Sequence, residues 1–268
     1  MNQEHQRLQA IVLAGERPGG NALARALHID AGVLAPVAGR TCLEHVLAAL
    51  RGSSAISGGV LVGPRAEVRE RSAVVTMLLA PGDFTWMAPA TGPAASARAA
   101  FAQLGAAGPV LLTSGDHALL TPRLVDDFCT QADAVDADLV TGLVSWERVH
   151  AAWPESRRTL LQFSDGARCG SNLFLLRTPR AAAVLEFWRA VERERKHPWR
   201  IARYLGIGVM LRYLGRRLGC AAAFEEVSRR AGATVGHVML DDPCAAVDVD
   251  SIDDRALAER ILRARAHA

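Results

Sequence analysis

The chain has 268 residues, of which 50% are hydrophobic and only 5% aromatic, and its formal net charge is +3. This length is enough to bury a substantial core, and we expect a single domain. The small positive charge is too weak to indicate a nucleic-acid-binding protein. No apolar run approaches the roughly 18 to 20 residues that a membrane span needs, and the polar N-terminus MNQEHQRLQ has no apolar signal core, so we expect a soluble protein.

Cysteine usage indicates the compartment. The chain has five cysteines, an odd number, with wide spacing, no CxxC pair and no histidine at zinc-ligand spacing. We therefore expect reduced thiols and a cytoplasmic location.

Short apolar runs bounded by Gly, Pro or Ser alternate with longer helical patterns, which is typical of βαβ units and a mainly parallel sheet. In chain order, strands are predicted at 10–14, 59–62, 74–79, 110–113, 138–144, 172–176, 234–239 and 245–249. Helices are predicted at 41–50, 92–104, 122–132, 179–195, 199–218, 221–231 and 252–266, with residues 187–232 forming a helical insertion. Thr121 can cap the third of these helices, and Pro122 occupies its first position, where a missing N–H is tolerated.

The first predicted strand leads directly into a glycine-rich turn with the sequence AGERPGG at 14–20. Small residues at such a turn let backbone N–H groups approach an anion such as phosphate. The turn matches neither the Walker pattern nor GxGxxG. On its own it indicates an ordinary turn as readily as a phosphate site.

Acidic side chains follow two of the predicted strands. Asp116 comes after the strand Val110–Thr113, and a side chain at the carboxyl end of a central parallel strand points into the crevice where ligands bind. Asp248 lies in the last predicted strand and Asp250 directly follows it, and the alternation of an extended chain puts both on one face. The alternatives are that Asp116 closes a turn or pairs with the next helix, and that the C-terminal acidic cluster begins the last helix, capped by Ser251.

Taken together, these motifs resemble the MobA-like nucleotidyltransferases. LAG at 13–15, LAPVAGR at 34–40 and the helix LEHVL are similar to that family's LAGGxGxR and KxLxPVxGxPLL patterns. SGDHALLTP at 114–122 resembles its GDxPLL motif, and AVDVDSIDD at 246–254 resembles its closing (N/D)x(N/D)TPED motif. The three motifs occur in the family's order across most of the chain.

The resemblance implies a single three-layer α/β/α domain of the nucleotide-diphospho-sugar transferase, or GT-A, type. It also implies transfer of an NMP group from an NTP to a phosphorylated or lipid-like acceptor, with Mg²⁺ as cofactor and release of pyrophosphate. CTP and GTP are the donors expected from the family.

The resemblance also assigns roles to residues. Catalytic roles fall on Arg17 and Asp116, and metal binding falls on Asp116, Asp250 and Asp248. Nucleotide binding falls on the first loop and on the start of the helix at 92–104, and acceptor binding on a basic stretch before the strand at 172–176. The nucleotide residues are Leu13, Ala14, Gly15, Glu16, Arg17, Thr91, Gly92 and Ser96, and the acceptor residues are Arg157, Arg158 and Asn172. The alternatives are an ordinary helix cap by Thr91 and ordinary surface arginines.

One residue departs from the family pattern. The position of its phosphate-binding lysine falls on Gly32, and no lysine lies nearby. Because a cation stabilises charge on the transferring phosphate, its loss slows the reaction unless another group, such as Arg25 or Arg40, replaces it. A non-catalytic nucleotide-binding or sensing protein is therefore an alternative. A glycosyltransferase in which Asp248-Val249-Asp250 forms the DxD motif is a further alternative. It is disfavoured, because a DxD motif normally follows a central strand of the sheet.

Residues 189–230 contain eleven Arg or Lys against four Glu, mixed with Trp, Leu and Met. Such a segment can form an interface for anionic lipid, a homodimer contact, or simple cover for the sheet. Cover for the sheet is the expectation, because a charged, partly apolar face more often packs on its own protein.

Overall fold

The computed structural model describes residues 7–16, 20–104, 108–194, 204 and 206–266. Arg17 and most of residues 195–205 lie outside the described residues. The helix predicted at 199–218 can therefore be compared only over its second half, where α10 (Ile207–Leu214) is helical.

Among the described residues, eight strands form one sheet in the order β10-β7-β9-β6-β1-β4-β5, with β8 paired to β9 at the side. All neighbours are parallel except β9, which is antiparallel to β6, β7 and β8. The mainly parallel sheet predicted from the sequence is thus confirmed. The strands are β1 (Leu8–Leu13), β4 (Ile56–Val62), β5 (Phe84–Met87), β6 (Val110–Ser114), β7 (Leu139–Ser145), β8 (Leu161–Phe163), β9 (Gly166–Leu176) and β10 (Val235–Leu240).

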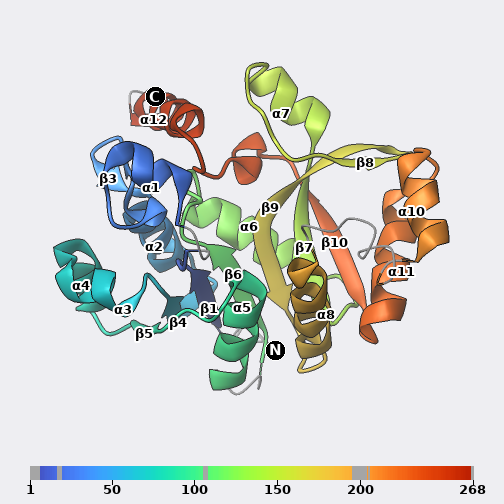
Figure 1. The fold of residues 1–268 in the computed structure, drawn as a ribbon, viewed down its shortest axis with the longest axis horizontal. Coiled ribbons are helices and arrows are strands. Elements are labelled where there is room, and N and C mark those ends of the chain that lie inside the picture. Colours follow the sequence, from blue (N-terminus) through green and yellow to red (C-terminus); the bar gives the residue numbers. More distant parts are fainter. Residues whose placement is uncertain (1–6, 17–19, 105–107, 195–203, 205, 267–268) are drawn as a thin grey trace, which may run out of the picture.

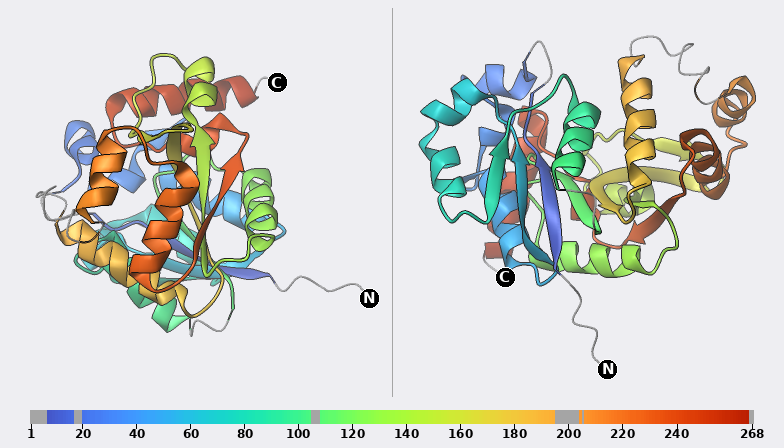
Figure 2. Two further views of the ribbon diagram at one scale, coloured as in Figure 1. Left: turned by 90° about the vertical axis from the view of Figure 1, so that its right-hand side faces the viewer. Right: turned by 90° about the horizontal axis from the view of Figure 1, so that it is seen from below.

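Helices cover both faces of this sheet (Figures 1 and 2). Because side chains alternate along a strand, Ala10 and Val12 of β1 pack with α2 and α6, whereas Ile11 packs with α5 and α8. The three layers are therefore α2 and α6, the sheet, and α5 and α8. The helices are α1 (Ala22–Leu27), α2 (Cys42–Gly52), α3 (Ala66–Arg71), α4 (Ala73–Leu79), α5 (Pro93–Gln103), α6 (Pro122–Asp133), α7 (Trp146–Ala152), α8 (Ala181–Arg193), α10, α11 (Cys220–Ala231) and α12 (Ile252–Ala266).

Short elements complete the fold. The 3₁₀ turn η1 (Gly32–Leu34) and a small antiparallel pair, β2 (Pro36–Val37) and β3 (Arg40–Thr41), lie near the N-terminus of α2, whereas a second 3₁₀ turn, η2 (Pro243–Ala246), packs against β7, β9 and α7. The five cysteines are all buried and form no disulfide. Within the described residues, no helix combines the length and the apolar character required to cross a bilayer.

The strand predicted at 74–79 is wrong, because the segment forms helix α4. The Ser72 side chain accepts the N–H of Val75 and so caps the helix, and Val75 and Leu78, three residues apart, face the core. The neighbouring position in the sheet is taken by β5 instead, whose residues pair with β4.

The strand predicted at 245–249 is also wrong. The Asp242 carboxylate accepts the N–H of Cys244 and begins the turn η2, and the following residues have no regular secondary structure. This segment crosses the carboxyl edge of the sheet, where the N–H of Val249 donates to the carbonyl of Asp116 at 3.1 Å. The third motif therefore reaches the second motif as an extended segment and not as a strand.

The predicted insertion at 187–232 contributes α10 and α11, which lie at the right-hand edge of the molecule in Figure 1, beyond β10 and beside β8. The single-domain organisation itself stays a prediction.

Candidate active site

The loops that follow β1, β4, β5 and β6 meet at the carboxyl edge of the sheet. The N–H of Ala14 donates to the carbonyl of Val62, and the N–H of Gly115 donates to the carbonyl of Leu13, each at 2.8 Å. Gly15 is required at this meeting point, because a Cβ there would lie 2.7 Å from the Cβ of Pro89. The first loop thus passes directly against the loop after β5.

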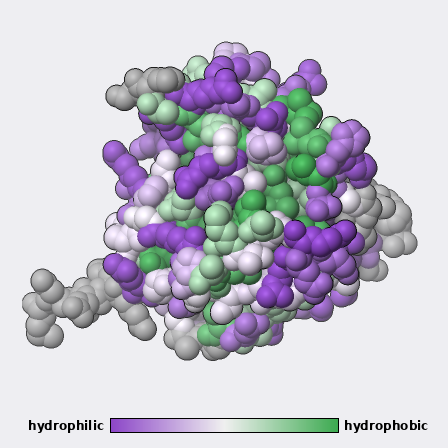
Figure 3. All heavy atoms as spheres, turned by 90° about the vertical axis from the view of Figure 1, so that its left-hand side faces the viewer, coloured by the Kyte–Doolittle hydropathy of each residue, from purple (hydrophilic) through white to green (hydrophobic). Residues whose placement is uncertain are grey.

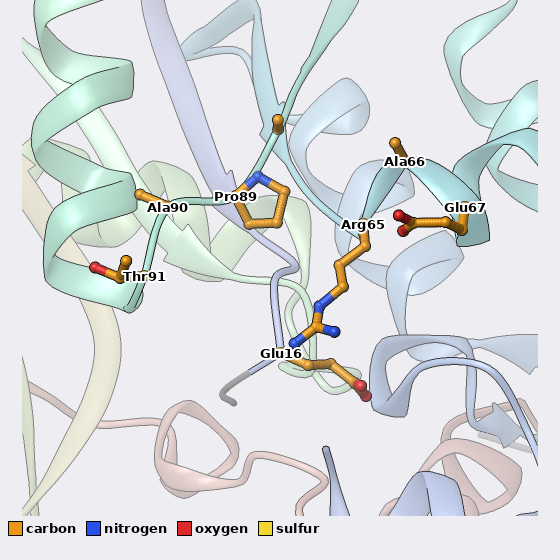
Figure 4. A pocket seen from close by; sticks show the side chains of 8 residues that line it. Glu16, Arg65, Ala66, Glu67, Pro89, Ala90 and Thr91 are labelled. Atoms are coloured by element: carbon orange, nitrogen blue, oxygen red, sulfur yellow. The ribbon is translucent and has the colours of Figure 1, made fainter. Parts of the chain in front are cut away.

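A cavity of about 420 Å³ opens between these loops, which is within the size range of small-ligand sites. Figure 4 shows the Arg65 side chain extending from the start of α3 toward Glu16. The lining residues are Glu16, Arg65, Ala66, Glu67, Ala88, Pro89, Ala90 and Thr91. Of these, only Glu16 and Thr91 were predicted as nucleotide-binding residues. Arg65 was missed, although it follows Gly-Pro directly after the buried strand β4, at the same edge of the sheet.

Glu16 forms a hydrogen bond with Gly32, the residue at the position where the family pattern has a lysine. Its Oε1 accepts the N–H of Gly32 at 2.7 Å. A Cβ on Gly32 would lie 2.4 Å from the Nδ2 of Asn21, whose side chain caps α1 by accepting the N–H of Ala24. A lysine at position 32 therefore requires Asn21 to move, and the first loop is packed around a residue without a side chain.

The two arginines considered as replacements for the lysine are both exposed. Arg25 belongs to α1, and its guanidinium lies beside Gly20, where a built Cβ would be 3.3 Å from its Nη1. It therefore lies near the end of the first loop. Arg40 lies on the short strand β3.

Asp116 follows β6 and is only partly exposed, with a buried Oδ1 that has no hydrogen-bond partner among the described residues. Burial, the largest cause, and the negative charges of Asp248 and Asp250 raise the pKa of this carboxyl to about 7. The Ser114 hydroxyl acts on the pKa in the opposite direction, although the two side chains form no hydrogen bond in this structure. The turn after β6 is closed by backbone bonds, including one from the N–H of Ala118 to the Asp116 carbonyl, so the carboxylate is not needed to close it.

Asp248 lies close enough to Asp116 to raise the pKa of its carboxyl. Both carboxylate oxygens of Asp248 accept hydrogen bonds. Oδ1 accepts from Nη1 of Arg158 at 2.7 Å, and Oδ2 accepts from Nδ2 of Asn172 at 3.3 Å. Two side chains from different elements thus fix the orientation of this carboxylate.

Arg158, predicted as an acceptor-binding residue, forms contacts within the protein. Its side chain is only 6% exposed, and its guanidinium pairs with Asp248 and Asp254 and donates to the Ser156 hydroxyl. A guanidinium held in this way connects the chain before β8 to the C-terminal segment. Its neighbour Arg157 is exposed and stays a candidate for the acceptor.

Asn172 is placed at the site by an irregularity in β9. Its φ is +53°, a left-handed conformation that asparagine tolerates better than most residues, and the pairing of β7 with β9 shifts register between Thr141 and Leu143. Because β9 is antiparallel to its neighbours, its early residues approach the carboxyl edge of the other strands. The side chain of Asn172 reaches Asp248 in this way.

The start of α5 differs from the interpretation of Thr91 as its helix cap. The N-cap is Gly92, with no side-chain cap, so a cap by Thr91 is not formed. A Glu192 oxygen from α8 instead accepts a backbone N–H of the first turn at 3.3 Å. Ser96 is buried, and its hydroxyl accepts the N–H of Ala90 at 3.0 Å, so it shapes the loop that lines the cavity.

His117, next to Asp116, is fully buried, and its Nε2 lies 3.2 Å from the carbonyl of Cys244. Burial lowers its pKa, which favours the neutral ring. The His117 side chain thus connects the end of β6 to η2. The spacing of residues in the sequence does not predict this contact.

The donor set at this edge fits a magnesium ion. Mg²⁺ is usually held by one or two protein carboxylates together with substrate phosphates, and Asp116 offers a buried carboxylate oxygen without a partner in the described chain. Asp250 is exposed and contributes to the local negative field. The described residues hold no group of three or more His, Cys, Asp or Glu side chains arranged around one point, so water and substrate phosphates would supply the other ligands.

The family model of the MobA-like NTP transferase domain matches residues 30–218, about 70% of the chain. The chain belongs to this family. The matched residues include Gly32, Asp116 and Asn172, whereas the first loop and the aspartates at 248 and 250 lie outside them. No curated protein matches the chain.

Solved structures agree with the family assignment. A hypothetical transferase from Thermus thermophilus is 29% identical, with a TM-score of 0.75 over 93% of this chain and 100% of that one. Two more distant structures share the fold at a lower level of similarity. They are the 4-diphosphocytidyl-2C-methyl-D-erythritol synthase of Anaerococcus prevotii (13% identity, TM-score 0.57, 97% of each chain) and a CMP:2-keto-3-deoxy-manno-octonic acid synthetase in complex with CTP (10% identity, TM-score 0.59, 97% of this chain and 100% of that one).

Proposed function

We propose that this MobA-like transferase moves an NMP group from an NTP to a phosphorylated acceptor in a Mg²⁺-dependent reaction that releases pyrophosphate. The observation that carries the proposal is the Asp116 carboxylate. It lies at the end of a central strand, beside Asp248, and keeps one buried oxygen without a partner among the described residues. An unpaired buried carboxylate is unfavourable for the fold alone, which is typical of a group kept for ligand binding.

The donor nucleotide would occupy the cavity between the first loop and the loop after β5. Backbone N–H groups near Gly15 can approach phosphate closely, and Arg65 supplies a cation in the cavity wall. CTP and GTP are the donors that we test first, because the family prefers them.

In the proposed reaction, an oxygen of the acceptor attacks the α-phosphorus of the NTP. A new P–O bond forms to the acceptor as the bond between the α-phosphorus and the bridging oxygen breaks, and pyrophosphate leaves. Mg²⁺, held by Asp116 with an aspartate of the C-terminal segment, would neutralise the charge on the phosphates. Arg158 and Asn172 orient Asp248, and Arg157 is the proposed contact for the phosphate of the acceptor.

The test is pyrophosphate release with each of the four NTPs, Mg²⁺ and a pool of phosphorylated small acceptors. Asp116→Asn is expected to lower the rate at least about 100-fold, because it removes a charged group that acts on the transferring phosphate. Asp127→Asn, at an exposed position of α6, is the matched control and should keep the rate. Release that is equal in the Asp116→Asn variant and the wild type would contradict the proposal.

A second candidate, a nucleotide-binding protein without turnover, is favoured by one observation. The first loop carries Glu16 at a position where the family pattern has a glycine. The Glu16 carboxylate accepts the backbone N–H of Gly32, which stands where the family pattern has a lysine. A carboxylate near a triphosphate repels it. A nucleotide that raises the melting temperature in a Mg²⁺-dependent way, with no pyrophosphate released under any condition, would establish this second candidate.

A further inference from the structure

Helix α10 lies at the edge of the molecule and packs on β8 through one side only. The Tyr213 hydroxyl accepts the N–H of Gln162 at 3.1 Å, and its ring meets the ring of Phe163 edge-on, with the centroids 6.3 Å apart. None of the eight residues of α10 is buried. Figure 2, left, shows α10 and α11 facing the viewer, in front of the edge of the sheet.

The outer side of α10 carries an apolar stripe of Ile207, Leu211 and Leu214. Their spacing of four and three residues aligns them along one side of the helix, away from Tyr213. They are 70%, 64% and 70% exposed, more than any other large hydrophobic side chain in the described chain. Contiguous exposed apolar side chains are typical of a contact surface for another molecule.

Three arginines lie on α10 and in the turn after it, near the C-terminal end of this stripe. Arg212 lies on α10, and Arg216 and Arg217 follow its C-terminus, where Arg216 has a φ of +53° and the N–H of Arg217 donates to the carbonyl of Arg212. All three arginines are exposed, and residues 206–219 contain no Asp or Glu. Within the described chain, none of the three forms an ion pair with a described carboxylate.

The opposite side of the molecule has a different character. Figure 3 shows the face over α3 and α4, where hydrophilic and apolar areas are mixed. On α4, Met77 is 56% exposed, but Val74 and Leu79 pack partly against the core. Among the large hydrophobic side chains that are exposed in the described part of the chain, only Ile207, Leu211 and Leu214 share one helix.

We propose that α10, with the turn that follows it, is a contact surface for a membrane that contains anionic lipid. Ile207, Leu211 and Leu214 would enter the boundary between headgroups and acyl chains, while Arg212, Arg216 and Arg217 bind lipid phosphates. An anionic bilayer offers both an apolar layer and continuous negative charge, which match the two halves of this surface. A twofold contact between two copies through the same stripe would bring the arginines of both copies together without a carboxylate between them.

The test is co-sedimentation of the protein with phosphatidylcholine vesicles that contain or lack phosphatidylglycerol, in the absence of nucleotide. The wild type is expected to bind only the vesicles with phosphatidylglycerol and to be released by high salt. Arg216→Gln with Arg217→Gln is expected to weaken binding about 25-fold, or about fivefold for each arginine. Leu211→Ser with Leu214→Ser should weaken it at least as much, because the apolar anchor is removed.

Two exposed positions elsewhere provide matched controls. Met77→Ser and Arg123→Gln, on α4 and α6, remove an exposed apolar and an exposed basic side chain and should leave vesicle binding unchanged. Melting curves show whether each variant is folded, and sedimentation equilibrium without vesicles gives the oligomeric state. The proposal is overturned if the wild type ignores anionic vesicles, if both double variants still bind like the wild type, or if the leucine variants only dissociate a dimer. Because vesicle binding is measured without substrates, its result is independent of whether pyrophosphate is released.

Discussion

At the residue scale, the environment of Asp116 makes its ionised carboxylate unfavourable for the folded protein and favourable for binding a cation. Burial and two nearby aspartates raise its pKa to about 7, so the folded protein binds a proton more tightly at this carboxyl than the unfolded chain does. The stabilising effect of the proton is complete below about pH 4 and is lost as the pH rises to about 7. A cation bound at the Asp116 carboxylate would offset its repulsion from Asp248 and Asp250.

We therefore predict that Asp116→Asn stabilises the ligand-free protein at pH 8 by about 1 to 3 kcal/mol, a range reduced for the partial exposure of the group. The gain should disappear at pH 4, where the wild-type carboxyl is protonated. Urea unfolding at the two pH values measures both effects. An Asp127→Asn control should show neither, and a variant less stable than the wild type at pH 8 would contradict the proposed repulsion.

A second prediction at this scale concerns Arg158, whose guanidinium pairs with two carboxylates while its neighbour Arg157 is exposed. Arg158→Met should destabilise the protein by about 2 to 4 kcal/mol, because Asp248 and Asp254 would keep their charges without the cation that pairs with both. Arg157→Met should change the free energy of unfolding by less than about 0.5 kcal/mol. Equal effects of the two substitutions in urea unfolding would show that the pair with Asp248 and Asp254 is not maintained in solution.

At the element scale, the start of α1 and the turn η1 are packed on each other at Asn21 and Gly32. We predict that Gly32→Ala destabilises the protein by about 1 to 3 kcal/mol, because its Cβ would meet the Asn21 side chain at 2.4 Å. Asn21→Gly alone should cost only a few tenths of a kcal/mol, since glycine is a tolerated N-cap.

The double variant should then be more stable than the sum of the single effects predicts, which a double-mutant cycle in urea measures. Additive effects would show that Asn21 moves freely. The same reasoning sets the design for restoring the family's lysine: Gly32→Lys is to be made together with Asn21→Gly.

The elements also show what linear patterns could and could not predict. The apolar runs of β1, β4, β6 and β7 were found because buried parallel strands are continuous apolar segments. The residues of α4 were assigned to a strand because Val74, Val75 and Thr76 are β-branched, whereas their burial at Val75 and Leu78 follows a helical spacing. Propensity was outweighed there by tertiary packing.

At the scale of the whole molecule, the fold class followed from the sequence, but the composition of the site did not. Asp116 was predicted from its place after a strand. The pairing of Arg158 with Asp248 joins residues 90 positions apart, and Arg65 reaches the cavity only because the loops after β4 and β1 meet. Such contacts depend on the topology of the sheet and leave no local signal.

A nucleotide bound to the folded state should stabilise the entire domain. We predict that the preferred NTP with Mg²⁺, at about 100 times its Kd, stabilises the protein by about 2.7 kcal/mol, or roughly 5 to 10 °C in Tm. Arg65→Ala should reduce the shift at the same nucleotide concentration, because Arg65 lines the cavity. Arg71→Ala, on α3 but outside the lining residues, is the control. A full shift in the Arg65→Ala variant would place the nucleotide elsewhere.

The reversed direction of β9 has a consequence for how such enzymes diversify. Its first residues approach the edge where the other strands end, so the connection before β9 and not the one after it borders the candidate active site. Insertions between α7 and β9 can therefore remodel one half of the site while β1, β4, β5 and β6 stay unchanged. Natural variation of that connection among related chains is expected to track the choice of acceptor, whereas the choice of nucleotide is inherited with the strands.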